Sequence, residues 1–184
     1  MSKKQRQAPS VNDLRPFEQA TVLATLAERD DVVGEAVQEE IERHLATVDP
    51  EGVACDVQFD FEFIDVDTIY ARSGRHGYGY TAPEEAAWQV LEETIEPYLQ
   101  RMQWYHGAGR DEACDAYALG ILRGLYDFHH DSEAEWKALA PDDTLELFEE
   151  VLLAWQQRRK GAAERQAMRD HLATWCPGWE RDVT

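Results

Sequence analysis

The densest group of side chains that could bind a metal ion or transfer a proton consists of Asp127, His129, His130 and Asp131. Asp127 and His130 stand three residues apart, so they share a face if the helix before them continues. Imidazole together with carboxylate suits a first-row transition metal. The sequence lacks the Glu-x-x-His repeats of di-iron bundles. The alternative interpretation is a polar helix end, where histidine is favourable against the C-terminal dipole.

A second candidate is an anion site in the glycine-rich segment 72–80, formed by Arg72, Arg75 and His76. A phosphate-binding Walker loop needs Gly-Lys-Ser or Gly-Lys-Thr after its last glycine, whereas Tyr80 and Thr81 follow here. A dinucleotide-binding loop needs Gly-x-Gly-x-x-Gly after a strand, and the spacing here is reversed. We interpret residues 74–80 as a connector between helices, with the anion site as the alternative.

Other chemistry-bearing residues lack the arrangement that a site requires. The acidic run from Asp56 to Asp67 has neither the ligand order nor the central glycine of an EF-hand, so it predicts a solvated acidic face. Cys176 and His171 could act as nucleophile and base, but no third group is indicated to orient the base. A thiol that packs between tryptophans is the favoured interpretation, and no cofactor is expected.

The net charge of −19 in 184 residues limits the partners of this chain. An acidic surface repels nucleic acid phosphates and anionic lipid heads, so we expect neither nucleic acid nor membrane binding. A basic protein or peptide, salt adaptation, and a mimic of DNA with carboxylates spaced like phosphates stay open. Residues 1–15 are instead basic and aperiodic, and we expect them to form a mobile tail.

The apolar runs and the cysteines bear on localisation. The longest apolar runs are four or five residues, far short of the ~20 that span a bilayer. Three widely spaced cysteines do not form a disulfide framework or a zinc ribbon. The short apolar runs predict a cytoplasmic protein, and the cysteine spacing predicts single buried or half-buried thiols.

Helical periods recur along the chain from residue 16. We predict a single all-α domain over residues 16–184, built of antiparallel helical hairpins as a bundle or a short superhelix. Thr81 with Glu84, and Ser132 with Glu135, have the spacing of capping boxes that begin helices.

Residues 50–64 are ambiguous between helix and strand. Apolar and polar residues alternate over 57–63, which is the pattern of a half-buried strand. Asp49 and Pro50 are instead a typical helix start, with Asp as N-cap and Pro at the first position. We favour a helix, because a lone strand would have no partner strand.

The segments 81–106 and 111–128 predict two long helices with contact surfaces. The first carries apolar residues at alternating spacings of three and four, the seam of a helix packed along its length. The second contains Gly-x-x-x-Gly, which allows close approach of another helix. The candidate interaction face taken from these helices comprises Trp88, Tyr98, Tyr105, Gly120 and Gly124.

This pair of helices resembles a tetratricopeptide hairpin over residues 81–128. Gly109, Ala113, Tyr117 and Gly120 match the small and aromatic residues of the second helix of that repeat. The Trp, Leu-Gly and Tyr pattern of the first helix and the 34-residue period are missing. The resemblance implies antiparallel helical hairpins.

Two functional hypotheses follow. The favoured one is a non-catalytic interaction or adaptor protein that holds a protein or peptide, with homo-oligomerisation through helix seams as a further option. The alternative is a metal-dependent or small-ligand enzyme with a site near His129 and His130. Because no complete catalytic motif is present in the sequence, a non-enzyme is favoured.

Overall fold

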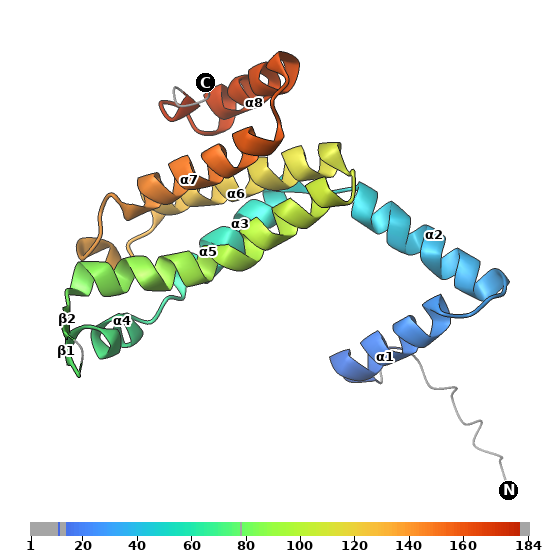
Figure 1. The fold of residues 1–184 in the computed structure, drawn as a ribbon, viewed down its shortest axis with the longest axis horizontal. Coiled ribbons are helices and arrows are strands. Elements are labelled where there is room, and N and C mark those ends of the chain that lie inside the picture. Colours follow the sequence, from blue (N-terminus) through green and yellow to red (C-terminus); the bar gives the residue numbers. More distant parts are fainter. Residues whose placement is uncertain (1–10, 12–13, 78, 181–184) are drawn as a thin grey trace, which may run out of the picture. The chain divides into compact units, whose positions relative to one another are not determined.

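The computed structural model describes residues 11, 14–77 and 79–180 (Figure 1). It confirms the all-α fold class, with one short β-hairpin in addition. The chain divides into two compact units, one up to Thr47 and one from Val48 onward, a division that the sequence did not indicate. Most of the predicted mobile tail, residues 1–10 and 12–13, lies outside the described residues.

The first unit is a hairpin of α1 (Pro16–Ala27) and α2 (Val32–Ala46). Proline at the first position begins α1, and the Asp31 carboxylate caps α2 by accepting from the backbone N–H groups of Val33 and Gly34 at 3.0 and 3.1 Å. Gly34 is the only buried residue among those described in this unit. The hairpin therefore has almost no core of its own.

The second unit is built around one central helix. Its elements are α3 (Pro50–Glu62), α4 (Val66–Arg72), β1 (Gly74–His76), β2 (Gly79–Thr81), α5 (Pro83–Gly107), α6 (Asp111–Asp131), the 3₁₀ turn η2 (Glu135–Ala138), α7 (Asp143–Arg158) and α8 (Ala162–Trp175). α6 contacts α3, α5, α7 and α8. Figure 1 shows α5 and α6 running antiparallel, as the tetratricopeptide resemblance implied.

The ambiguous segment is the helix α3. Asp49 caps it by accepting from the N–H of Glu51 at 3.1 Å, and Pro50 opens it as predicted. Val57 and Phe61, one helical turn apart, are fully buried. Phe59 and Phe63 are instead exposed, with their rings 4.4 Å apart. The apolar residues whose alternation suggested a strand therefore lie on two sides of a helix, one buried and one exposed.

The glycines of α6 allow α3 to approach its backbone. A Cβ on Gly120 would lie 2.6 Å from Val53 Cβ and 2.7 Å from the Pro50 carbonyl oxygen. A Cβ on Gly124 would lie 2.6 Å from the Ala54 carbonyl oxygen. The close approach predicted from Gly-x-x-x-Gly is thus an internal contact, made by α3.

An aromatic cluster closes the far end of this contact. The Phe128 ring meets Phe61 edge-on at 5.7 Å and stacks on Trp136 at 5.1 Å. The Trp136 indole donates to the Phe61 carbonyl at 3.1 Å, which satisfies the only polar group of this side chain. The turn η2 thus places Trp136 in the core.

The prediction of two capping boxes is wrong. Thr81 belongs to β2, and α5 begins at Pro83 after Ala82, which makes no side-chain cap. Ser132 ends α6, and its hydroxyl accepts from the Ala134 N–H at 3.0 Å and donates to Glu62. Each motif stands beside a helix start but does not cap it.

The glycine-rich connector is an antiparallel β-hairpin and not an irregular loop. Gly74 pairs with Thr81, and His76 pairs with Gly79. Gly74 has φ +98°, a value that favours glycine.

Candidate ligand-binding groove

The structure brings the His129 and His130 rings to 5.1 Å from each other but does not complete the predicted metal cluster within the described residues. The Asp127 carboxylate accepts from Arg123 Nε at 2.5 Å, and His130 Nδ1 lies 2.9 Å from the Tyr126 carbonyl oxygen. His129 packs against the Trp179 ring at 4.9 Å, and Asp131 is exposed. Within the described ranges, no three His, Cys, Asp or Glu side chains are placed to hold a metal ion.

His129 has one feature that the cluster does not explain. Its Nδ1 is buried and has no hydrogen-bond partner in the part of the chain that the structure describes. Burial, with His130 and Lys137 nearby, lowers the pKa of the imidazole, so it is neutral at pH 7.

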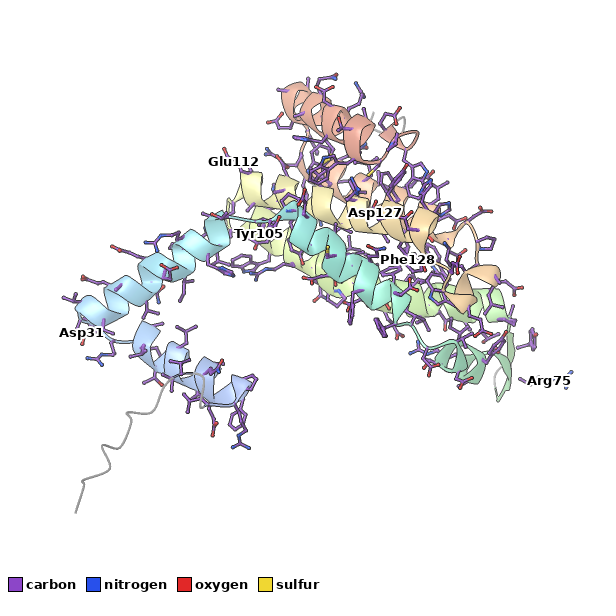
Figure 2. All side chains as sticks on the ribbon, turned by 180° about the vertical axis from the view of Figure 1, so that it is seen from behind. Asp31, Arg75, Tyr105, Glu112, Asp127 and Phe128 are labelled. Atoms are coloured by element: carbon purple, nitrogen blue, oxygen red, sulfur yellow. The ribbon has the colours of Figure 1, made fainter. Side chains whose placement is uncertain are left out.

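Two of the predicted anion-binding residues, Arg72 and Arg75, have different surroundings. Arg72 Nη1 donates to Glu93 at 2.8 Å. Arg75 projects from the β-hairpin, at the end of this unit opposite to Glu112 (Figure 2). The backbone of His76 pairs within the hairpin.

The predicted interaction face is largely interior. Tyr105 is buried, and Trp88 and Tyr98 are half-buried. The Tyr98 hydroxyl donates to Asp60 at 2.6 Å and so ties α5 to α3. α3 covers Gly120 and Gly124. The predicted helix seam is therefore part of the core of this unit.

A groove of about 440 Å³ lies among α6, α7 and α8. Its size falls in the range of ligand-binding pockets. The floor is apolar, with Leu119, Trp155 and Met168 buried in it. The rest of the apolar lining is Ala116, Ala167, Trp175 and Pro50, the first residue of α3. The polar lining residues are Glu112, Asp115, Glu164 and His171. The groove therefore combines an apolar interior with an acidic rim.

An ion-pair network fixes the three helices that form the groove. Arg159, at the end of α7, donates to Asp115 through Nε at 2.9 Å and Nη2 at 3.0 Å. Its Nη1 lies 2.8 Å from Asp111, and its Nη2 lies 3.9 Å from Glu164 of α8. The Trp155 indole also donates to Asp115 at 2.8 Å. Asp115 therefore has its partners beneath the rim, whereas Glu112 is exposed (Figure 2).

The sequence did not reveal this groove. Asp115 and Arg159 are 44 residues apart, and no local motif joins them. Trp155 follows Leu145, Phe148 and Leu152 at helical spacings, a pattern that indicates a buried helix face and not a groove. The weak signal was a half-polar surface on helix 111–128, where Glu112 and Asp115 are one turn apart.

The thiol considered as a nucleophile lies in the core. Cys176 is fully buried, and burial raises the pKa of its thiol to about 12. A protonated, buried thiol is a poor nucleophile, whereas His171 is exposed. The structure thus supports the packing interpretation of Cys176.

No helix within the described residues is long and apolar enough to cross a bilayer. No family model matches the chain, and no curated protein or solved structure matches it.

Proposed function

We propose that this chain is a non-catalytic interaction protein that binds a peptide segment of a partner in the groove among α6, α7 and α8. The observation that carries the proposal is the apolar floor of Leu119, Trp155 and Met168 beneath an acidic rim. Such a surface suits an apolar anchor residue flanked by lysine or arginine.

The charge of the chain supports a basic partner. The net charge of −19 would accelerate encounter with a positively charged segment at low ionic strength. Glu112 is exposed, so it can pair with a basic side chain at the rim. Three free cysteines agree with a reducing compartment, and we place this binding activity in the cytoplasm.

The test is a selection of displayed peptides on the full chain, followed by titration of the enriched peptides. Trp155 and Trp175 line the groove, so their fluorescence reports occupancy directly. Enriched peptides should share an apolar anchor next to a basic residue. Ala167→Phe places a ring in the groove and should weaken binding at least ~10-fold, or about 1.4 kcal/mol.

Ala163→Phe is the matched control, because Ala163 is exposed on the same helix and does not line the groove. Glu112→Gln should weaken basic peptides more than neutral ones. Peptides that bind the Ala167→Phe protein as tightly as the unmodified chain would place the binding surface elsewhere, and a failure to enrich any peptide would contradict the proposal.

A further inference from the structure

The N-terminal hairpin exposes apolar surface that its own two helices cannot cover. Phe17 is 60% exposed and Val32 is 78% exposed. No residue of α1 is buried. Residues 14–47 are a short segment. A chain of fewer than ~40 residues usually needs oligomerisation, a metal or disulfides to be stable.

The width of the apolar surface on α1 shows that one neighbouring helix is not enough. At 100° per residue, the apolar arc from Val22 through Leu26 and Leu23 to Phe17 spans roughly 220° of the helix. Only Gln19 interrupts it, and its amide donates to the carbonyls of Val11 and Leu14. A helix with one apolar neighbour typically has a stripe of about 100°. α2, together with Val11 and Leu14 beside Val22 and Leu26, therefore leaves part of the arc uncovered, because Val22 is 43% and Leu23 is 49% exposed.

A groove along α2, with Leu23 of α1 at its edge, matches the uncovered part in length and chemistry. Its volume is about 680 Å³, and its lining is apolar except for Glu40 and His44. The ridge from Val33 to Leu45 is about 18 Å long, and the 12 residues of α1 also span about 18 Å. An α1 helix thus fits along the groove.

The charges favour a second copy of this hairpin as the occupant. α1 contains one charged residue, Glu18, which pairs with Arg15 at 3.1 Å. Other α2 carboxylates, Glu35, Glu39 and Glu42, line a separate hollow with Arg43. Two apolar faces can therefore meet without opposing like charges.

We propose that residues 14–47 are a dimerisation hairpin, in which α1 of each copy lies in the groove of the other and completes a four-helix bundle. Two-fold dimers use the same patch on both copies, so each groove receives one helix. This inference is independent of the peptide groove, which lies in the second unit.

The test uses native mass spectrometry and sedimentation velocity on the full chain. The unmodified protein should have twice the 21.1 kDa chain mass, with a dissociation constant in the micromolar range or below. Ala20→Lys and Ala36→Glu each place a charge on an exposed alanine near the middle of its helix. Each should weaken the dimer at least ~10-fold, because burying an unpaired charge is costly. Alanine, lysine and glutamate are all good helix formers, so the hairpin itself should persist.

Mixing the two variants should restore dimers that contain one chain of each, because a two-fold arrangement then opposes lysine to glutamate. Thr25→Glu, on the polar side of α1, and Ala173→Glu, on α8, are matched controls that should leave the dimer intact. A monomer up to roughly 100 µM, or a dimer unaffected by both substitutions, would overturn the proposal. Recruitment of a monomeric chain by phosphatidylcholine or phosphatidylglycerol vesicles would also overturn it, in favour of a lipid surface.

Discussion

At the scale of single residues, the three cysteines differ in solvent accessibility, which their spacing in the sequence does not indicate. Cys55 is exposed, whereas Cys114 and Cys176 are buried. Burial raises the pKa of Cys114 to about 11 and that of Cys176 to about 12, so both thiols are protonated at neutral pH. The reactive species of a cysteine is the thiolate.

We therefore expect one fast reaction with a disulfide reagent in the native protein, removed by Cys55→Ser. The other two thiols should react only after denaturation. Counting released thiolate at pH 8 with and without urea measures this directly. Fast native labelling of more than one cysteine would contradict the burial of the pair.

His129 makes folding stability depend on pH. Its pKa is lowered from 6.5, chiefly by burial, so the folded protein favours the neutral ring. As the pH falls below 6.5, the unfolded chain binds a proton that the folded chain resists, and the free energy of unfolding decreases. Urea titrations at pH 7.5 and 5.5 should show this loss, and it should be smaller in His129→Gln. The exposed His171→Gln is the control.

At the scale of elements, the contact between α3 and α6 depends on two missing side chains. Gly120→Ala or Gly124→Ala would place a Cβ 2.6 Å from atoms of α3. Because backbone oxygens and a β-branched valine cannot move aside easily, each should lower the free energy of unfolding by roughly 1–3 kcal/mol.

Gly107→Ala is the matched control for this contact. Gly107 is also helical, yet a Cβ there has no heavy atom within 4 Å. Chemical denaturation of the three variants should separate Gly107→Ala, which is neutral or stabilising, from the other two. Equal effects at all three sites would mean that helix propensity, and not close packing, determines the change in the free energy of unfolding.

The elements were predictable where a cap and a period agree. The helix start at Asp49 and Pro50 was predicted correctly, because the Asp49 carboxylate caps the helix that follows. The prediction at Thr81 was wrong. The spacing from Thr81 to Glu84 fits a capping box, but Thr81 is the last residue of the β2 strand. The β-hairpin was missed because strands of three glycine-rich residues have no apolar alternation.

At the scale of the whole molecule, helical periods identified apolar faces but not what covers them. Apolar residues recur with a helical period on α2 as they do on later helices, yet α2 belongs to a separate compact unit. The peptide groove was equally hidden, since Asp115 and Arg159 meet only through the tertiary fold. Periodicity is a local property of the sequence, whereas the element that covers an apolar helix face is formed by residues far away in the chain.

The high negative charge should make the chain more stable in salt. Burial, and then the nearby carboxylates Glu92 and Glu146, raise the pKa of Glu150. Raising NaCl from 0.1 to 1 M shortens the screening length from about 10 to about 3 Å, which weakens this repulsion. The free energy of unfolding should therefore increase.

Glu150→Gln separates this repulsion from general salt effects. The substitution should stabilise the protein by a few tenths of a kcal/mol in 0.1 M salt and by less in 1 M salt. Urea titrations of both proteins in both salts give the comparison. A difference that does not shrink in high salt would contradict an electrostatic cause.

The pairing of α3 with α6 also has a consequence for synthesis. Val53 meets Gly120, which follows it by 67 positions in the chain. At about 5–20 residues per second, α3 leaves the ribosome roughly 3–13 s before its partner helix exists. During that time Val57 and Phe61 have no α6 to cover them, so a nascent chain paused before residue 111 is the form of this protein that most needs a chaperone.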